Sequence, residues 1–132
     1  MFIPILLLVL AQFSLFSPPP TLTGIASQYD PGVMSHAISY RQRHHQIPHD
    51  LSSYSGFMAV LESDNIGREY WVRPINSSTW EKFLAVDCAG IADGGYSWMV
   101  NSGIIAEIDY DSAVRWGVVG IGVEIEMIPL TQ

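Results

Sequence analysis

The last quarter of the chain constrains the fold more than any other segment. From Gly103 to Ile128 it reads GIIAEIDYDSAVRWGVVGIGVEIEMI: an apolar run, an acidic step, a short helical pattern, a glycine-containing turn and a second apolar run. Over 123–127, apolar residues alternate with glutamates at the two-residue period of a β-strand. Asp111 is expected to cap the helix over 112–116. Asp109 directly follows an apolar strand, which is where a barrel opens to solvent.

The rest of the sequence repeats this pattern of short apolar segments separated by turn residues. Strands are expected over 21–29, 56–61, 69–75, 81–88, 103–109 and 123–128, and a helix over 33–44. The strands at 56–61 and 69–75 are expected to form a hairpin around the turn 64–67. Residues 96–102 form either a short helical turn or irregular structure. Six short strands without regular strand–helix alternation predict a mainly β, six-stranded barrel with one or two short helices, and an α+β sandwich is the alternative.

The chain of 132 residues has room for one folded domain and a tail. Residues 1–16 carry no charged side chain, and about fifteen apolar residues fit a signal-peptide core better than a spanning helix of about twenty. Residues 1–20 are expected to be an export signal, or an uncleaved membrane anchor, that ends in the stiff spacer Pro18–Pro20. Residues 21–132 are expected to form the domain. The protein is therefore predicted to be secreted or held in the cell envelope, touching a membrane only through its N-terminal segment.

The charge balance narrows the classes of partner. The formal net charge of −7 excludes a nucleic-acid partner, because few cationic side chains are present to neutralise a row of phosphates. It also argues against docking on an anionic membrane, whereas a neutral polymer such as a glycan fits. Cys88 is the only cysteine, so no disulfide forms within the chain. It reads as a small buried side chain or as a nucleophile, and the neighbouring Asp87 disfavours the second by raising a thiol pKa.

Three segments, in order, resemble the double-psi β-barrel domains of the rare lipoprotein A and expansin type. The first is Gly24-Ile25-Ala26-Ser27-Gln28-Tyr29, which is similar to the opening Gly-x-Ala-Ser-x-Tyr strand of that family. The second is Ala85-Val86-Asp87-Cys88-Ala89-Gly90, similar to a middle strand that ends in Asp before a glycine turn. The third is Ile108-Asp109 with Ala113 and Gly117 in the following helix. The resemblance implies a double-psi barrel that acts on or binds a cell-wall glycan, such as peptidoglycan.

The chain departs from the family pattern at several places. The Arg-Gly-Pro that follows the middle Asp in the family is missing here, and Tyr110-Asp111 replaces the Leu-Ser that follows the later Asp. The helical segment after Tyr29 has no counterpart in the family pattern. These departures favour a non-catalytic role over cleavage.

Three aspartates are the candidate catalytic residues. Asp109 matches a groove carboxylate that the resemblance ties to glycan cleavage or wall loosening, and a carboxyl at an apolar strand end suits a general acid. Its alternative role is to start the helix that follows. Glycoside hydrolysis normally needs a second carboxylate, for which Asp87 and Asp30 are the candidates. The alternative role of Asp87 is a structural hydrogen bond that braces the loop at Gly90, and the alternative role of Asp30 is that of a turn residue before Pro31.

Aromatic and histidine side chains give further candidates. Four aromatic residues near strand ends are candidate substrate-binding residues, with one or two of them expected in a groove: Tyr29, Tyr110, Trp98 and Trp116. His45 and His49 have the spacing of a helical zinc pair, but Pro48 lies between them, so a solvated loop that includes His44 is the preferred interpretation. No metal and no cofactor are predicted.

Three functions fit these residues. The first is an exported barrel that binds or cleaves a polysaccharide, as a lytic transglycosylase or a glycoside hydrolase, with Asp109 as the acid and Asp87 or Asp30 assisting. The second is a non-catalytic glycan-binding or wall-loosening module. The third is a structural or interaction barrel, in which Asp109 would bond to backbone amides.

Overall fold

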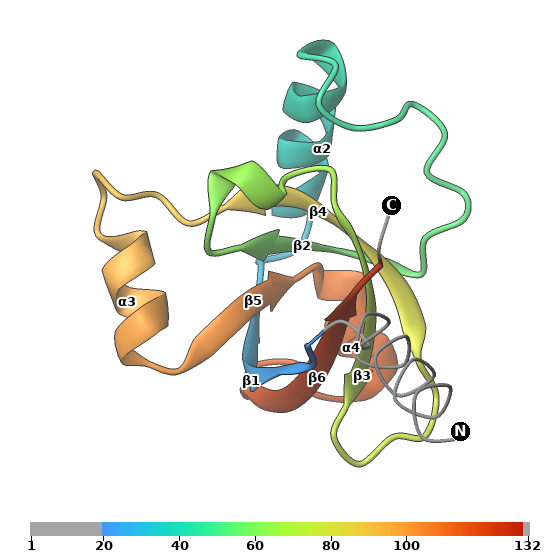
Figure 1. The fold of residues 1–132 in the computed structure, drawn as a ribbon, viewed down its shortest axis with the longest axis vertical. Helices are drawn as coiled ribbons and strands as arrows, with labels where there is room; N and C mark the ends of the chain where they lie inside the picture. The colour runs from blue at the N-terminus through green and yellow to red at the C-terminus, as the bar shows by residue number, and fades with distance from the viewer. Residues whose placement is uncertain (1–19, 131–132) are drawn as a thin grey trace, which may run out of the picture.

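The computed structural model of the protein describes residues 20–130. The predicted export signal or anchor lies outside the described residues apart from Pro20. Six strands are present: β1 (Leu22–Gln28), β2 (Gly56–Val60), β3 (Glu69–Pro74), β4 (Glu81–Cys88), β5 (Ile104–Ile108) and β6 (Val123–Pro129). The helices are α2 (Val33–Arg43), α3 (Gly95–Asn101) and α4 (Tyr110–Trp116), with a 3₁₀ turn, η1 (Ser63–Asn65). The predicted mainly β fold with six strands is confirmed (Figure 1).

The strands close into a barrel in the order β1-β5-β2-β4-β3-β6. Two pairs of neighbours are parallel, β1 with β5 and β2 with β4, and the other four pairs are antiparallel. Closure gives each of the six described strands a hydrogen-bonded neighbour on both sides. The parallel pairs bring segments far apart in the sequence side by side, above all the first strand and the fifth.

The predicted hairpin between the second and third strands is wrong. Strand β2 pairs with β4 and β5, whereas β3 pairs with β4 and β6, so the two never share a ladder. The predicted turn between the two strands is present, because η1 and Gly67, which has a left-handed backbone conformation (φ 89°), lie there. Turn-forming residues indicate that the chain changes direction, but they do not identify the strand with which each neighbouring strand pairs.

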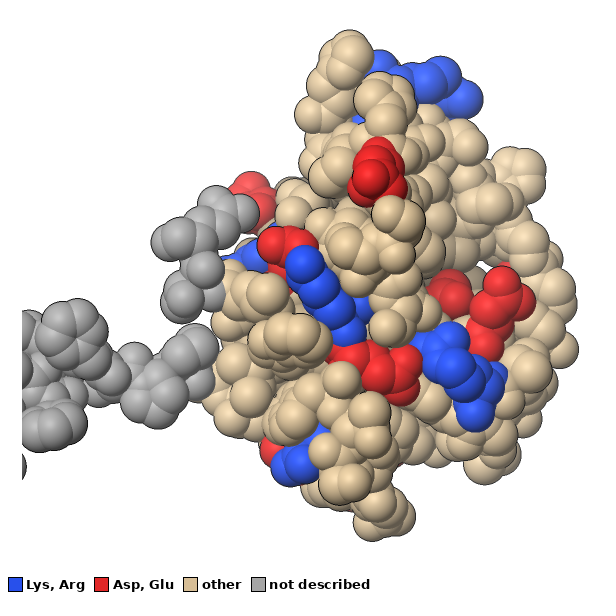
Figure 2. All heavy atoms as spheres, turned by 90° about the vertical axis from the view of Figure 1, so that its right-hand side faces the viewer, with Lys and Arg blue, Asp and Glu red and all other residues tan. Residues whose placement is uncertain are grey.

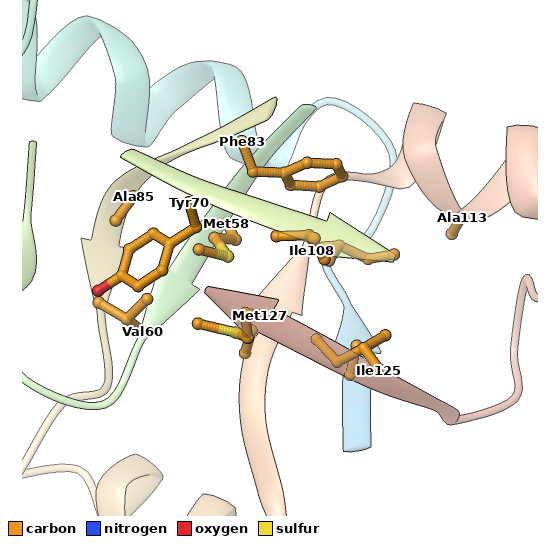
Figure 3. Close-up of a cluster of buried hydrophobic side chains, with 12 residues drawn as sticks. Met58, Val60, Tyr70, Phe83, Ala85, Ile108, Ala113, Ile125 and Met127 are labelled. Carbon is orange, nitrogen blue, oxygen red and sulfur yellow. The ribbon is translucent and has the colours of Figure 1, made fainter. Parts of the chain in front are cut away.

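Inward-facing apolar side chains of all six strands fill the barrel. They come from alternate positions, as the period of a strand requires, and include Met58 and Val60 of β2, Ile108 of β5, and Ile125 and Met127 of β6. Ala113 of α4 closes one end of this cluster (Figure 3). The interior is thus packed with side chains, so any binding site must lie at an end or on the outer surface.

A second apolar cluster attaches α2 to the outer face of β4. Met34 of α2 and Ile47 of the following loop pack on Leu84 and Val86. The inward side chain of Phe83 belongs to the barrel interior, so β4 is buried on both faces. This explains why its sequence reads as a continuous apolar run rather than as an alternating one.

The helices differ in detail from the sequence prediction. Helix α2 ends at Arg43, within one residue of expectation, and α3 resolves the open choice over 96–102 in favour of a helix. Asp111 was predicted to cap the last helix, and this is wrong: α4 starts at Tyr110, and the Asp109 side chain accepts from the Ser112 amide. Among residues 20–130, no helix has the length and apolar character needed to cross a membrane.

Candidate functional site

The parallel pairing of β1 and β5 brings two of the predicted acids to one cleft. Asp30 follows the end of β1 and Asp109 follows the end of β5, and the register Gln28–Ile108 places both just beyond the same end of the barrel. Together with Tyr110 and the first turn of α2 they line a cavity of about 190 Å³, which we call the Asp109 cleft. The sequence therefore identified two residues that the fold does bring together.

Within this cleft, the contacts of Asp109 are those of a structural residue. Its Oδ1 accepts from the Phe57 amide (2.9 Å) and the Ser112 hydroxyl (2.7 Å), and its Oδ2 accepts from the Ser112 amide (3.1 Å). The Asp109 amide donates to the Phe57 carbonyl (2.9 Å). The carboxylate thus caps α4 and ties it to β2, with both oxygens occupied. Asp30 is exposed in the turn before α2, where its carbonyl accepts from the Val33 amide (3.2 Å).

Asp87, the third predicted acid, lies on the other side of α2. It lines a groove of about 390 Å³ whose other residues come from the end of β1 and from α2. We call this the α2 groove; its lining residues are Tyr29, Val33, His36, Ala37, Tyr40, Arg41 and Asp87. The structure therefore divides the predicted catalytic residues between two sites, with Asp30 and Asp109 in one and Asp87 in the other.

Arg41 fixes the Asp87 carboxylate from α2. One guanidinium nitrogen, Nη2, lies 3.0 Å from Asp87 Oδ1, and Nε donates to the carbonyl of Val86 (3.2 Å). The side chains of Arg41 and Asp87 are 17% and 25% exposed, so solvent screens this ion pair less than one on the open surface. Gln46 accepts a further bond from Nη1 (3.0 Å), which holds the guanidinium from its other side.

Tyr29 completes the bonding of Asp87. Its hydroxyl donates to Asp87 Oδ2 at 2.7 Å, and the Cys88 amide donates to Oδ1 at 2.9 Å. Burial, and then the bond to Asp87, raise the pKa of Tyr29 far above its ordinary value. The phenol therefore keeps its proton at physiological pH and serves as a permanent donor to the carboxylate.

Glu107 lies near the group formed by Tyr29, Arg41 and Asp87, which we call the acid cluster, and the sequence did not identify it. It is half-buried on β5, and burial and then the charge of Asp87 raise the pKa of its carboxyl group. The Ser27 hydroxyl beside it works in the opposite direction, although this buried hydroxyl forms no well-aligned hydrogen bond with a described residue. The alternation in the segment IIAEI could have shown that Glu107 faces away from the barrel interior. The residues that surround Glu107 could not be identified, because they depend on the order of the strands in the barrel.

Cys88 lies at the end of β4, half-buried rather than fully enclosed. Burial and the charge of Asp87 raise the pKa of its thiol, whereas Arg41 lowers it. The direction agrees with the expectation drawn from the adjacent carboxylate, and it leaves the thiol protonated and a weak nucleophile near neutral pH.

The four predicted aromatic residues have four different environments. Tyr29 lines the α2 groove and Tyr110 the Asp109 cleft. Trp98 projects from α3 and is 50% exposed, lining neither site. Trp116 packs on Phe83, with ring centroids 5.6 Å apart, and its indole nitrogen donates to Glu81 (2.6 Å). Only the two tyrosines are therefore placed where a ligand in these sites would meet them.

A further aromatic surface was not predicted. Trp71, Trp80 and Ile128 line an apolar hollow of about 360 Å³ on the outer face of β3 and β6. Trp71 is 41% exposed, and the guanidinium of Arg73 lies over the Trp80 ring at 4.3 Å. Trp71 and Ile128 are cross-strand neighbours, which is why residues distant in sequence form one surface.

The histidines lie mostly outside these sites. His36 lines the α2 groove, whereas His44, His45 and His49 are exposed at or beyond the end of α2. His45 has a positive φ of 57°, so it does not continue the helix on which a zinc pair would need to lie. Within 20–130, no three His, Cys, Asp or Glu side chains gather in a way that could hold a metal ion.

Charges of opposite sign are interspersed on one face of the molecule. On the face in Figure 2, lysines and arginines lie beside aspartates and glutamates instead of forming a patch of one sign. Two ion pairs of this kind are Lys82–Glu69 (3.0 Å) and Arg115–Glu81 (2.6 Å).

Comparison of the chain with family models, with curated proteins and with solved structures gave no match.

Proposed function

We propose that the protein binds a neutral glycan chain of the cell envelope, such as the sugar backbone of peptidoglycan, and that the α2 groove holds this chain. The observation that carries the proposal is the joining of Tyr29, Arg41 and Asp87 on the wall of one open groove. Aromatic faces pack against the apolar faces of sugar rings, while fixed carboxylate and guanidinium groups bond to sugar hydroxyls. The groove offers both kinds of group.

The groove also has a second aromatic side chain at its edge. Tyr40 of α2 is 46% exposed, and the Arg41 guanidinium carbon lies 5.1 Å from its ring centroid. The Tyr40 ring also packs against the His44 ring, with centroids 4.3 Å apart, and its exposed part can stack on a sugar while Tyr29 and Arg41 keep their bonds to Asp87. The negative net charge adds to the case for an uncharged ligand, since it would repel an anionic polymer.

We also infer that the barrel has the double-psi connectivity of the rare lipoprotein A and expansin type. The support is the closed order with two parallel pairs, β1 with β5 and β2 with β4, together with the three sequence segments that resemble that family. Export is proposed from the uncharged apolar run at residues 1–16. Expression in a bacterium, followed by fractionation and intact-mass measurement, tests export and shows whether residues 1–20 are removed.

Glycan binding is tested by co-sedimentation with purified peptidoglycan and with uncharged insoluble polysaccharides. Tyr40→Ala and Arg41→Ala should each weaken retention on the glycan. Arg43→Ala is the matched control, because Arg43 occupies the same last turn of α2 but is exposed and does not line the groove. Equal retention of all variants, or no retention of the unsubstituted protein on any glycan, would reject the α2 groove as a sugar site.

A structural or interaction barrel is the second candidate, and a specific observation favours it. Both oxygens of Asp109 are occupied by groups of Phe57 and Ser112, as expected for a residue that holds the barrel end together. This makes Asp109 a poor general acid. Failure of the protein to bind any glycan, combined with a large loss of stability on replacing Asp109, would support this second function.

A further inference from the structure

The apolar hollow lined by Trp71, Trp80 and Ile128, which we call the tryptophan hollow, lies on the outer face of β3 and β6. Trp71 faces outward because its neighbours along β3, Tyr70 and Val72, belong to the barrel interior. The cross-strand partner of Trp71 on β6 is Ile128, so these two outward side chains lie side by side on the sheet. Strand pairing therefore fixes two of the three side chains that line the hollow.

The third lining side chain, Trp80, is oriented by its neighbours. The guanidinium of Arg73 lies over the Trp80 ring, 4.3 Å from its centroid. Arg73 Nη2 in turn forms an ion pair with Glu126 (3.4 Å), its cross-strand partner on β6. A side chain that is already held in one orientation loses less conformational entropy when a ligand binds. The Trp80 ring is therefore prepared for a ligand that contacts its remaining surface.

The charged side chains beside the hollow form ion pairs. Arg73 is paired with Glu126, and Lys82, the β4 partner of Trp71, is paired with Glu69 (3.0 Å). All four charged side chains are 22–31% exposed, so their polar atoms remain accessible to a ligand. Together they offer hydrogen-bond donors and acceptors without a net charge. The ligand that complements this surface is uncharged, with an apolar face and hydroxyl groups at its edge.

We propose that the tryptophan hollow is a second sugar-binding site, in which a ring of a neutral glycan stacks on Trp71 and Trp80. The apolar C–H face of a sugar ring packs against the indole surfaces, and the ring hydroxyls bond to the paired charges beside them. The choice of a cell-envelope glycan rests on the proposed function. The hollow shares no lining residue with the α2 groove, so the two sites can be tested separately.

The size of the hollow favours a sugar over a protein partner. Its volume of about 360 Å³ falls within the range of about 300–1,000 Å³ that is typical of small-molecule sites. A stable protein interface instead buries about 800 Å² and roughly 20–30 residues on each partner. A hollow lined by three side chains provides much less than that. A ring of a longer glycan therefore fits this surface better than a second protein does.

The first arm of the test follows the indole N–H signals of the full chain by ¹H–¹⁵N NMR. Soluble uncharged oligosaccharides are added, first an N-acetylglucosamine oligomer and then a cellulose oligomer. The signals of Trp71 and Trp80 should shift and saturate, whereas those of Trp98 and Trp116 should stay fixed, because neither lines the hollow or the α2 groove. Fixed Trp71 and Trp80 signals with both oligomers overturn the inference. Movement of these two signals with protein concentration alone would assign the hollow to a second copy of the chain and would also overturn it.

The second arm measures the dissociation constant of the oligosaccharide through the Trp80 signal. Trp71→Ala should weaken binding about 2- to 10-fold, the range expected for the loss of one aromatic stacking contact, and Trp71→Phe should recover part of it. Trp98→Ala is the matched control, because Trp98 is 50% exposed, close to the 41% of Trp71, but lies on α3 outside the hollow. Equal affinities of Trp71→Ala and Trp98→Ala overturn the inference.

The two sugar sites are separated by comparing Trp71→Ala with Tyr40→Ala. Tyr40 lines the α2 groove, so Tyr40→Ala should leave the glycan-induced shifts of Trp71 and Trp80 unchanged. Loss of glycan retention in Tyr40→Ala, combined with full retention in Trp71→Ala, overturns the inference and leaves the α2 groove as the sugar site. Loss of retention in Trp71→Ala, combined with full retention in Tyr40→Ala and Arg41→Ala, would confirm the tryptophan hollow and reject the α2 groove.

Discussion

Replacing Asp109 with alanine separates the structural role of this residue from the catalytic role that its sequence position suggests. The substitution removes three hydrogen bonds at once: those to the amide and hydroxyl of Ser112, and that to the amide of Phe57. The first anchors the start of α4, and the last ties α4 to β2 across 52 positions of sequence. We therefore expect a loss of stability before any loss of chemistry.

The size of the loss follows from these contacts. Removing a helix N-cap costs about 0.5–2 kcal/mol. Leaving the half-buried Phe57 amide and the fully buried Ser112 hydroxyl without this acceptor costs about 1–3 kcal/mol more. The unfolding free energy should therefore fall by about 1.5–5 kcal/mol, and the melting temperature by about 6–20 °C at about 4 °C per kcal/mol for a domain of this size.

Urea denaturation at one fixed pH, followed by circular dichroism, measures the change. Asp109→Asn keeps one acceptor oxygen and a good capping residue, so it should lose about 1–2 kcal/mol. Asp111→Ala is the matched control: Asp111 is exposed in the first turn of α4, and its interaction with the helix dipole is worth about 0.3–1 kcal/mol. A loss below about 1 kcal/mol for Asp109→Ala would refute the reasoning, because the lost cap and the two stranded donors together should cost at least about 1.5 kcal/mol.

Three further predictions follow from the barrel and from the acid cluster. A Cβ on Gly56 would overlap the ring of Phe83, so Gly56→Ala should lower the unfolding free energy by about 1–3 kcal/mol in urea; an unchanged midpoint would contradict this packing. The folded-state pKa of Glu107 is raised above its unfolded value, so the unfolding free energy falls as pH rises through the interval between the two pKa values, by about 1.4 kcal/mol for each pKa unit. Glu107→Gln lacks this loss, so its unfolding free energy should rise relative to that of the unsubstituted protein between pH 4 and pH 8. If the difference in unfolding free energy between the two proteins is the same at both pH values, the pKa of Glu107 is not raised. Cys88 should react with iodoacetamide more slowly than free cysteine at pH 8, and Asp87→Asn should accelerate the reaction; a rate equal to that of free cysteine would show that the thiol pKa is not raised.

Sequence pattern was a good guide to the elements and a poor guide to their pairing. The strand at 81–88 was predicted with its observed ends, and the helix from Val33 was predicted to within one residue. Both predictions depend on local features, namely residue type, period and turn residues. The hairpin between β2 and β3 failed because the parallel partner of β2 follows β3 in the sequence. Long-range pairing of this kind has no signature in the residues between two strands.

The helix cap shows how a local prediction fails by a small shift. Asp109 and Asp111 both precede the helix-forming residues, and both are good capping residues. The helix starts at Tyr110 because β5 ends at Ile108, and the Phe57 backbone on β2 holds residue 109 in extended conformation. The choice between the two aspartates is thus decided by the neighbouring strand, which the local sequence does not identify.

The acid cluster has the same origin. Tyr29, Asp87 and Glu107 are separated by 58 and 20 positions along the chain, and they meet only because β5 and β2 lie between β1 and β4. Closing the barrel in this order brings the Asp87 carboxylate, held by Arg41, near the half-buried Glu107, whose pKa is raised by burial and then by the charge of Asp87. Asp109, by contrast, stabilises the end of the barrel, because its carboxylate accepts a hydrogen bond from the Phe57 amide of β2. The fold therefore gives the acid favoured by sequence resemblance a structural role, because both oxygens of the Asp109 carboxylate accept hydrogen bonds from its own chain.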